Sequence, residues 1–138
     1  MKSIILLTLS LLFYRTASAQ TLHLYGGKSH DVYLGCLNCD KYDSNSVWNP
    51  FGNYGSKYNS YSIWNRYGNY GNKYSDTSPW NGYASNPPVV VDKQGNFYGY
   101  FTVNTYKNNR AEFKLALYLY KFYDEIREDV SKLYELIF

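Results

Sequence analysis

A sixteen-residue unit that occurs three times between Lys41 and Ser85 constrains the fold of this chain more than any other feature. Two series mark its register without slippage: Lys-Tyr pairs at 41, 57 and 73, and Trp-Asn pairs at 48, 64 and 80. One such unit alone cannot bury its aromatic face, so successive copies are expected to share one conformation and to stack on each other.

Stacking in this register predicts columns of like aromatic rings. The expected columns are Trp48, Trp64 and Trp80; Tyr42, Tyr58 and Tyr74; and Phe51, Tyr67 and Tyr83. Paired glycines, such as Gly52 and Gly55, are expected to supply left-handed or tight positions where the chain reverses. Each copy within residues 41–85 is therefore predicted to consist of short extended pieces joined by Gly/Asn turns, rather than of helix.

The first nineteen residues have the organisation of an export signal. A positive start precedes an apolar run over residues 4–13, and the small residues at 17–19 form a pattern that a signal peptidase accepts. Cleavage before Gln20 would leave residues 20–138 as one domain in the periplasm or outside the cell. An uncleaved anchor is the alternative, but the apolar run has about half the length of a membrane-spanning helix. No stable membrane insertion is expected after cleavage.

Composition limits the partners of the exported chain. Of the 138 residues, 28 are Trp, Tyr or Phe and only one is Met, so the core is expected to be largely aromatic. The formal net charge is +3, and removal of Lys2 and Arg15 with the signal leaves +1. So small a charge gives no reason to expect nucleic-acid binding or attraction to anionic lipid.

The residues that follow the repeats predict a hairpin. Within residues 88–104, two apolar runs flank a turn that starts at Asp92 and contains Gly95. This spacing is typical of a β-hairpin whose turn is closed by a left-handed glycine.

The last segment predicts an amphipathic helix over residues 109–137. Asn109 and Glu112 match a capping box, and apolar residues then recur every three or four positions. We expect this helix to pack on the sheet, with a membrane-surface or partner-binding helix as the alternative. The predicted fold class is therefore α+β, a short β-rich repeat stack plus a β-hairpin, covered by a C-terminal amphipathic helix.

The Cys36-x-x-Cys39 motif is the sharpest chemical candidate. In an exported protein this spacing favours a structural disulfide. A redox-active pair is expected at the start of a helix, and the residues after Cys39 are poor helix formers. A metal site would need His23 and His30, whose spacing from the cysteines is not a familiar zinc pattern. A thiol- or metal-dependent envelope enzyme centred on Cys36, Cys39 and His30 is kept as the alternative function.

Tyr and Asn side chains of the repeats are the remaining candidates. Exposed rings in a repeating array can stack on sugars, and neighbouring Asn and Ser side chains can supply hydrogen bonds. The sequence thus favours an exported, non-catalytic binding or structural module that presents its repeats to a glycan or an envelope protein. It leads us to assign no catalytic residue, metal or cofactor. The expected binding residues are Tyr54, Tyr58, Tyr70, Tyr74, Asn53 and Asn69.

Three motifs together resemble a group of small, uncharacterised bacterial proteins. They are the G-C-L-N-C stretch at 35–39, the tandem W-N/Y-G units, and the P-P-V-V-V-D-x-x-G-N-F-Y-G-Y-F-T-V-N segment at 87–104. The similarity covers about residues 30–104. It implies a bacterial, periplasmic or secreted setting and implies no activity or substrate.

Overall fold

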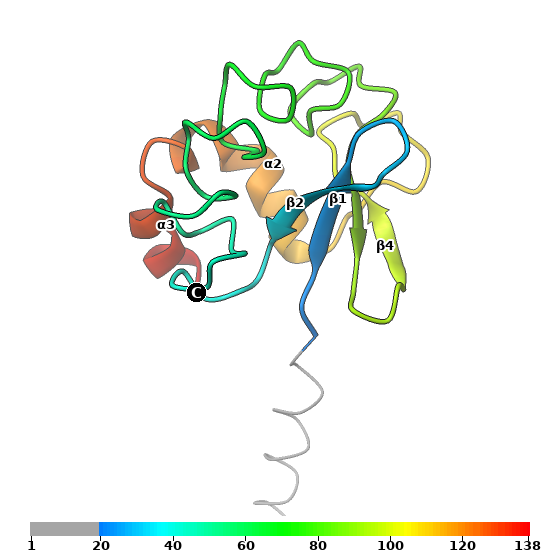
Figure 1. Ribbon diagram of the computed structural model, residues 1–138. Coiled ribbons are helices and arrows are strands. Elements are labelled where there is room, and N and C mark those ends of the chain that lie inside the picture. Colours follow the sequence, from blue (N-terminus) through cyan, green and yellow to red (C-terminus); the bar gives the residue numbers. More distant parts are fainter. Residues whose placement is uncertain (1–19) are drawn as a thin grey trace, which may run out of the picture.

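The computed structural model describes residues 20–138, so the predicted export signal at 1–19 lies outside the described residues. One four-stranded antiparallel sheet, in the order β2-β1-β3-β4, is followed by two helices (Figure 1). The elements are β1 (His23–Gly26), β2 (Val32–Cys36), β3 (Val89–Val91), β4 (Phe97–Tyr100), α2 (Lys114–Ile126) and α3 (Val130–Ile137). The predicted α+β fold class is confirmed.

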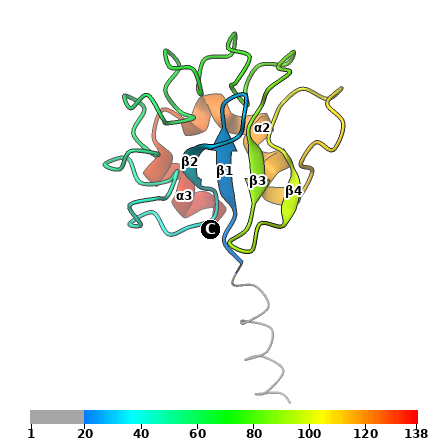
Figure 2. The same ribbon diagram turned by 45° about the vertical axis from the view of Figure 1, so that its right-hand side comes forward.

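The central strand β1 pairs with β2 on one side and with β3 on the other. Leu24, Leu34 and Val90 are fully buried in the core, whereas Tyr25 and Tyr33 lie opposite each other and are half-buried. All three repeats belong to the connection between β2 and β3. Since these two strands flank β1, the repeats begin and end at the same sheet, and Figure 2 shows them as a fan of loops around it.

The repeats consist of turns and bends rather than of the short extended pieces expected from the sequence. Backbone N–H groups donate to carbonyl groups three residues earlier in four successive steps, and a fifth step spans four residues. Together these steps account for the period of sixteen. In the second unit the donor-acceptor pairs are Asn59–Ser56, Ser62–Asn59, Asn65–Ser62, Gly68–Asn65 and Asn72–Gly68.

The second glycine of a unit is required by close packing, not by a left-handed backbone. A Cβ atom on Gly55 would overlap the backbone of Asn49, and one on Gly71 would overlap the backbone of Asn65. The described glycines with positive φ all lie outside the repeats. Of the two expected alternatives, left-handed or tight positions, the repeats show the tight one, and the reason for glycine there is the absence of a side chain.

The tryptophans form the predicted column inside the fan. Ring centroids are 5.8 Å apart both from Trp48 to Trp64 and from Trp64 to Trp80, and all three side chains are buried. Each indole Nε1 donates a hydrogen bond of 2.6 Å to a carbonyl oxygen outside its own unit. The acceptors are Leu37 for Trp48, Val47 for Trp64 and Ile63 for Trp80. Each buried indole thus links its layer of the stack to the layer before.

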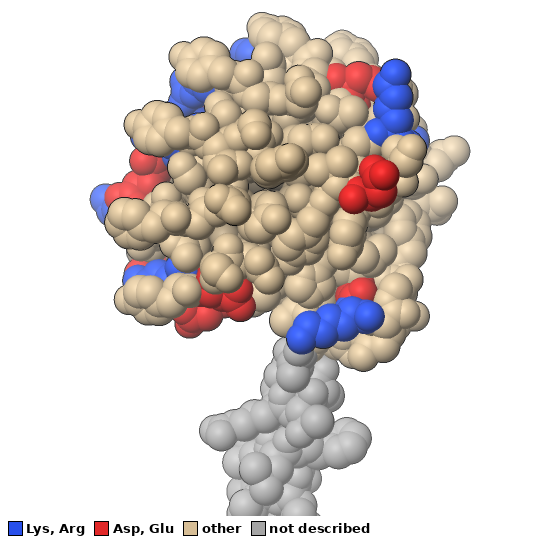
Figure 3. Space-filling model, in the orientation of Figure 1, with Lys and Arg blue, Asp and Glu red and all other residues tan. Residues whose placement is uncertain are grey.

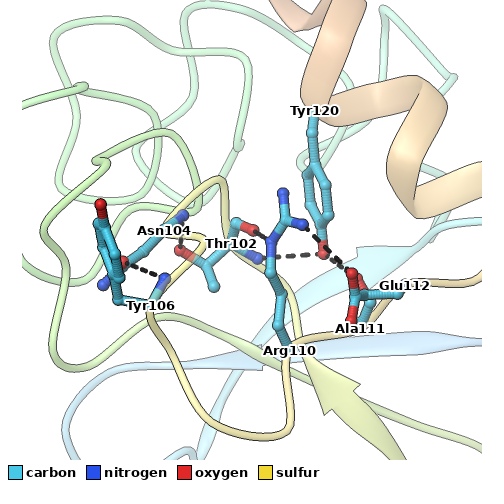
Figure 4. A network of polar contacts seen from close by, with 7 residues as sticks. All are labelled: Thr102, Asn104, Tyr106, Arg110, Ala111, Glu112 and Tyr120. Carbon is cyan, nitrogen blue, oxygen red and sulfur yellow. Dashed lines mark hydrogen bonds and ion pairs between the residues drawn. The ribbon is translucent and has the colours of Figure 1, made fainter.

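An incomplete fourth copy follows the hairpin at residues 102–106 (Figure 4). The Thr102 hydroxyl accepts the Asn104 N–H at 3.0 Å, and the Asn104 side-chain oxygen accepts the Tyr106 N–H at 3.0 Å. Complete copies make two bonds of the same kind, but there Trp donates to Ser and the following Asn accepts, whereas Asn104 does both. The backbone N–H of Val103 donates to the Pro79 carbonyl at 2.8 Å. This bond takes the place of an indole donor, so the stack continues for one layer without a tryptophan.

The hairpin has the predicted turn. Gly95 has a φ of 83°, and the Asp92 carboxylate accepts the N–H groups of Gln94 and Asn96. The second strand ends at Tyr100, earlier than the expected boundary at residue 104.

The C-terminal helix differs from the predicted continuous helix over 109–137. Asn109 has a φ of 59° and does not cap a helix, because the backbone from Asn109 to Ala111 bonds to both backbone groups of Tyr100. The first helix therefore starts at Lys114. A second helix starts after a break at 127–129, where the Asp129 carboxylate accepts the Lys132 N–H at 3.1 Å.

Both helices pack on the tryptophan column, whereas the sequence led us to expect packing on the sheet. Tyr123 of α2 stacks on Trp80 with ring centroids 4.4 Å apart. At the other end of the column, Tyr134 of α3 and Phe138 contact Trp48 at 6.0 and 5.7 Å. The repeats therefore have an inner side that meets the helices and an outer side that faces solvent.

Candidate functional site: an exposed aromatic ridge

Each unit places two aromatic side chains in solvent while it buries its tryptophan. One follows the Lys at the start of the unit, and the other lies three residues after the Trp. The fourth copy contributes one more. All seven are at least 80% exposed, and we call them the aromatic ridge: Tyr42, Phe51, Tyr58, Tyr67, Tyr74, Tyr83 and Tyr106.

A local hydrogen bond holds the backbone at every ridge position. The N–H of each ridge residue donates to a side-chain oxygen two residues earlier, at 2.8–3.3 Å. Asn, Asp and Ser form such turns readily because their short side chains reach the backbone. The acceptors are Asp40, Asn49, Ser56, Asn65, Asn72, Asn81 and Asn104. The ridge is therefore presented on an ordered backbone, which lowers the entropic cost of binding.

Lysines accompany one row of the ridge. The ammonium groups of Lys41, Lys57 and Lys73 lie 5.3, 5.8 and 5.3 Å from the ring centroids of the tyrosines that follow them. These distances fit cation–π contacts. In Figure 3 the charged side chains lie mainly around the edge of the face shown, and the centre of that face carries no charge.

The structure separates the six expected binding residues into two groups. Tyr58 and Tyr74 belong to the ridge, and Asn53 and Asn69 are exposed beside it. Tyr54 and Tyr70 are half-buried between the repeats and the sheet.

Both half-buried tyrosines contact the sheet. The Tyr54 ring meets the Tyr33 ring edge-on with centroids 5.0 Å apart. Tyr70 packs against the core beside Gly26, and this burial raises the pKa of Tyr70. They therefore join the repeats to the sheet.

The ridge residues that lie three positions after each Trp form its second row: Phe51, Tyr67 and Tyr83. They were not among the binding residues expected from the sequence. A signal was present, because Asn followed two residues later by Phe or Tyr occurs at every one of these positions. The same spacing at Asn104 and Tyr106 marks the fourth copy. It was missed because that copy lacks the tryptophan used to set the register.

The predicted disulfide between Cys36 and Cys39 is present, and the described chain has no free cysteine. The short loop that it closes contains Leu37, whose carbonyl oxygen accepts the Trp48 indole N–H. His30 does not join the disulfide in one site, because its Nε2 lies 3.0 Å from the Pro87 carbonyl oxygen instead. Within residues 20–138 no group of three or more His, Cys, Asp or Glu side chains is arranged to hold a metal ion.

A hollow of about 600 Å³ on the sheet is lined partly by His23, Tyr33 and Asp92. His23 Nδ1 lies 2.8 Å from the Tyr33 hydroxyl. Burial lowers the pKa of His23 and raises the pKa of Tyr33, which favours the uncharged forms of both. The Asp92 carboxylate accepts bonds from Asn96 and Tyr98, so it stabilises the hairpin instead of orienting the imidazole.

No family model, curated protein or solved structure matches this chain. Neither helix in the described part of the chain has the length and apolar character needed to cross a membrane. The functional argument therefore depends on the geometry of the ridge.

Proposed function

We propose that this chain is an exported, non-catalytic binding module that holds a glycan on its aromatic ridge. The observation that carries the proposal is the recurrence of aromatic side chains, at least 80% exposed, at two equivalent positions of the repeat. Aromatic faces stack on the apolar faces of sugar rings, and the Asn and Ser side chains between them supply polar partners. Exposed apolar groups that recur in this way mark an interaction surface more often than scattered single residues do.

Periodicity favours a polysaccharide over an envelope protein as the partner. A polysaccharide presents the same ring at regular intervals, and the ridge presents the same side chains on successive copies of one unit. Several weak stacking contacts along one polymer add up through their high effective concentration. A protein partner would instead favour a desolvated central cluster with a polar rim.

The test compares the purified protein with a double variant, Tyr67→Ala and Tyr83→Ala, by affinity electrophoresis and calorimetry against a panel of neutral and acidic polysaccharides. Loss of two stacking rings should weaken binding at least about tenfold, a change of roughly 1.4 kcal/mol. The matched control is Tyr118→Ala, because Tyr118 is exposed on α2 outside the ridge. If no polysaccharide binds, or if the double variant binds like the control, the proposed function is wrong.

A further inference from the structure

Arg127 lies at the break between the two helices and is only 5% exposed. Its Nε is the only buried side-chain nitrogen or oxygen of the described residues that has no hydrogen-bond partner. The nearest carboxylate oxygen, on Asp124, is 3.6 Å away, which is outside hydrogen-bonding distance. Burial lowers the pKa of Arg127, but a guanidinium stays charged in proteins. The Asp124 carboxylate still forms a long ion pair with the guanidinium, but a buried nitrogen donor without a hydrogen bond is costly and needs an explanation.

Three hollows between the repeats and the helices share Arg127 as a lining residue. Their volumes are about 140, 250 and 260 Å³. Ridge residues Tyr58, Tyr67 and Tyr74 line the same hollows. We call these hollows together the Arg127 groove. A ligand seated on this part of the ridge would therefore lie next to the guanidinium.

Positive charge is in excess in the Arg127 groove. The cations that line it are Lys57, Arg66, Lys73 and Arg127, and the anions are Asp124, Glu128 and Asp129.

Some of these charges are paired within the protein and others are not. Glu128 is paired with Arg66, Asp124 is paired with Arg127, and the Asp129 carboxylate caps α3. Lys57 and Lys73 form no ion pair within residues 20–138. After internal pairing, the groove therefore keeps cations that are available to a ligand.

We infer that the Arg127 groove binds the oxyanion groups of an acidic glycan whose sugar rings stack on the neighbouring ridge. This inference rests on the proposed function and narrows it to one substrate class. A guanidinium offers several donors in one plane, which suits the two oxygens of a carboxylate or sulfate. Such a group would bond to the terminal nitrogens of this guanidinium, because Nε itself is buried, and Lys57 and Lys73 would contact further anionic residues of the same polymer.

The test measures binding of alginate, dextran sulfate and neutral dextran by calorimetry at low and high salt. We expect the wild-type protein to bind an acidic polymer at least about tenfold more tightly than dextran, with a preference that falls as salt rises. Binding of alginate alone identifies a carboxylate as the recognised group, and binding of dextran sulfate alone identifies a sulfate.

The decisive variant is Arg127→Met, which keeps the length of the side chain and removes its charge. Acidic-polymer binding should fall at least about tenfold, while Tm changes little, because the ion pair that is lost is long and its Asp124 carboxylate is exposed. The control is Lys121→Ala, an exposed lysine of α2 that does not line the groove. Should Arg127→Met fail to fold, Arg66→Gln and Lys73→Ala test the same groove at exposed positions.

Wild-type affinity for the acidic polymers in Arg127→Met would overturn the inference. So would affinity for dextran equal to that for both alginate and dextran sulfate, although the proposed function would then still stand if the Tyr67 and Tyr83 double variant lost binding. Loss of binding in Arg127→Met with no effect of the double variant would instead contradict the role proposed for the ridge.

Discussion

Trp64 and Tyr67 are three residues apart in the same unit, yet the first is completely buried and the second is 89% exposed. The backbone N–H of each residue donates a hydrogen bond to a side chain two residues earlier. The Ser62 hydroxyl accepts the Trp64 N–H at 3.1 Å, and the Asn65 side chain accepts the Tyr67 N–H at 3.1 Å. The unit thus uses two similar turns to send one ring inward and the next outward.

The inner and outer sides also differ in how they connect successive units. On the inner side, each indole donates to a carbonyl group of the layer before it. On the outer side, the backbone N–H of each ridge residue bonds only to a side chain two residues earlier in the chain. Stability is therefore concentrated in the tryptophan column, and the ridge can change with little effect on the fold.

The largest expected effect is that of Trp64→Ala. Truncation of this buried ring should lower the free energy of unfolding by about 3–5 kcal/mol in denaturant titrations. Tyr67→Ala is the matched control in the same unit and should change it by less than about 0.5 kcal/mol. Comparable losses in the two variants would remove the distinction between the inner and outer sides.

Alkaline pH provides a second test, through Tyr120, a buried tyrosine of α2. Burial raises the pKa of Tyr120 from 10.0 to about 12. Its hydroxyl donates to the Ala111 carbonyl at 2.7 Å and accepts the Thr102 N–H at 3.3 Å (Figure 4).

The sign follows from the order in which the two states lose the proton. Below pH 10 the phenol is protonated in both states, and its contribution to stability is fully present. Between pH 10 and 12 the unfolded chain ionises first, so about 2–3 kcal/mol of stability is lost.

Tyr120→Phe should flatten this part of the pH profile. It should also lower stability at neutral pH by about 1–3 kcal/mol, because the buried Ala111 carbonyl loses its donor. Tyr33, whose pKa is raised as well, leaves some slope in the variant. Urea titrations at several pH values measure both effects, and an unchanged slope in Tyr120→Phe would contradict the assignment.

The smallest expected effects come from two glycines of the repeats. An alanine Cβ at Gly71 would overlap the Asn65 backbone, and Gly71→Ala should cost about 1–3 kcal/mol as overpacking. Gly82 has no atom within 4 Å of such a Cβ. Gly82→Ala should therefore leave stability within about 0.5 kcal/mol of wild type, as measured by thermal melting. Equal losses at both positions would mean that Gly71 is needed for its backbone conformation instead.

Features set by local chemistry or by the repeat itself were predictable. The tryptophan column follows from the constant spacing of Trp48, Trp64 and Trp80, since equivalent positions of a stacked repeat must lie over one another. The disulfide follows from two cysteines three residues apart in a chain with an apparent export signal. The Gly95 turn follows from the need for positive φ at that point of a tight hairpin.

Features that depend on distant contacts were missed. The capping box at Asn109 and Glu112 is a valid local signal, but the strand edge at Tyr100 takes the backbone bonds of that segment first. The Arg127 groove has no sequence signature, because its lining comes from all three repeats and from the segment that joins α2 to α3.

The period of the chain and its turn-forming side chains were thus enough to imply a stack of aromatic layers. Three outcomes depended on how the fan of loops closes over α2 and α3: which aromatic residues join the repeats to the sheet, which remain in solvent, and where a guanidinium nitrogen is buried without a hydrogen bond. The reason is that a repeat specifies contacts between like positions, whereas burial is set by whatever element the fold brings against each side.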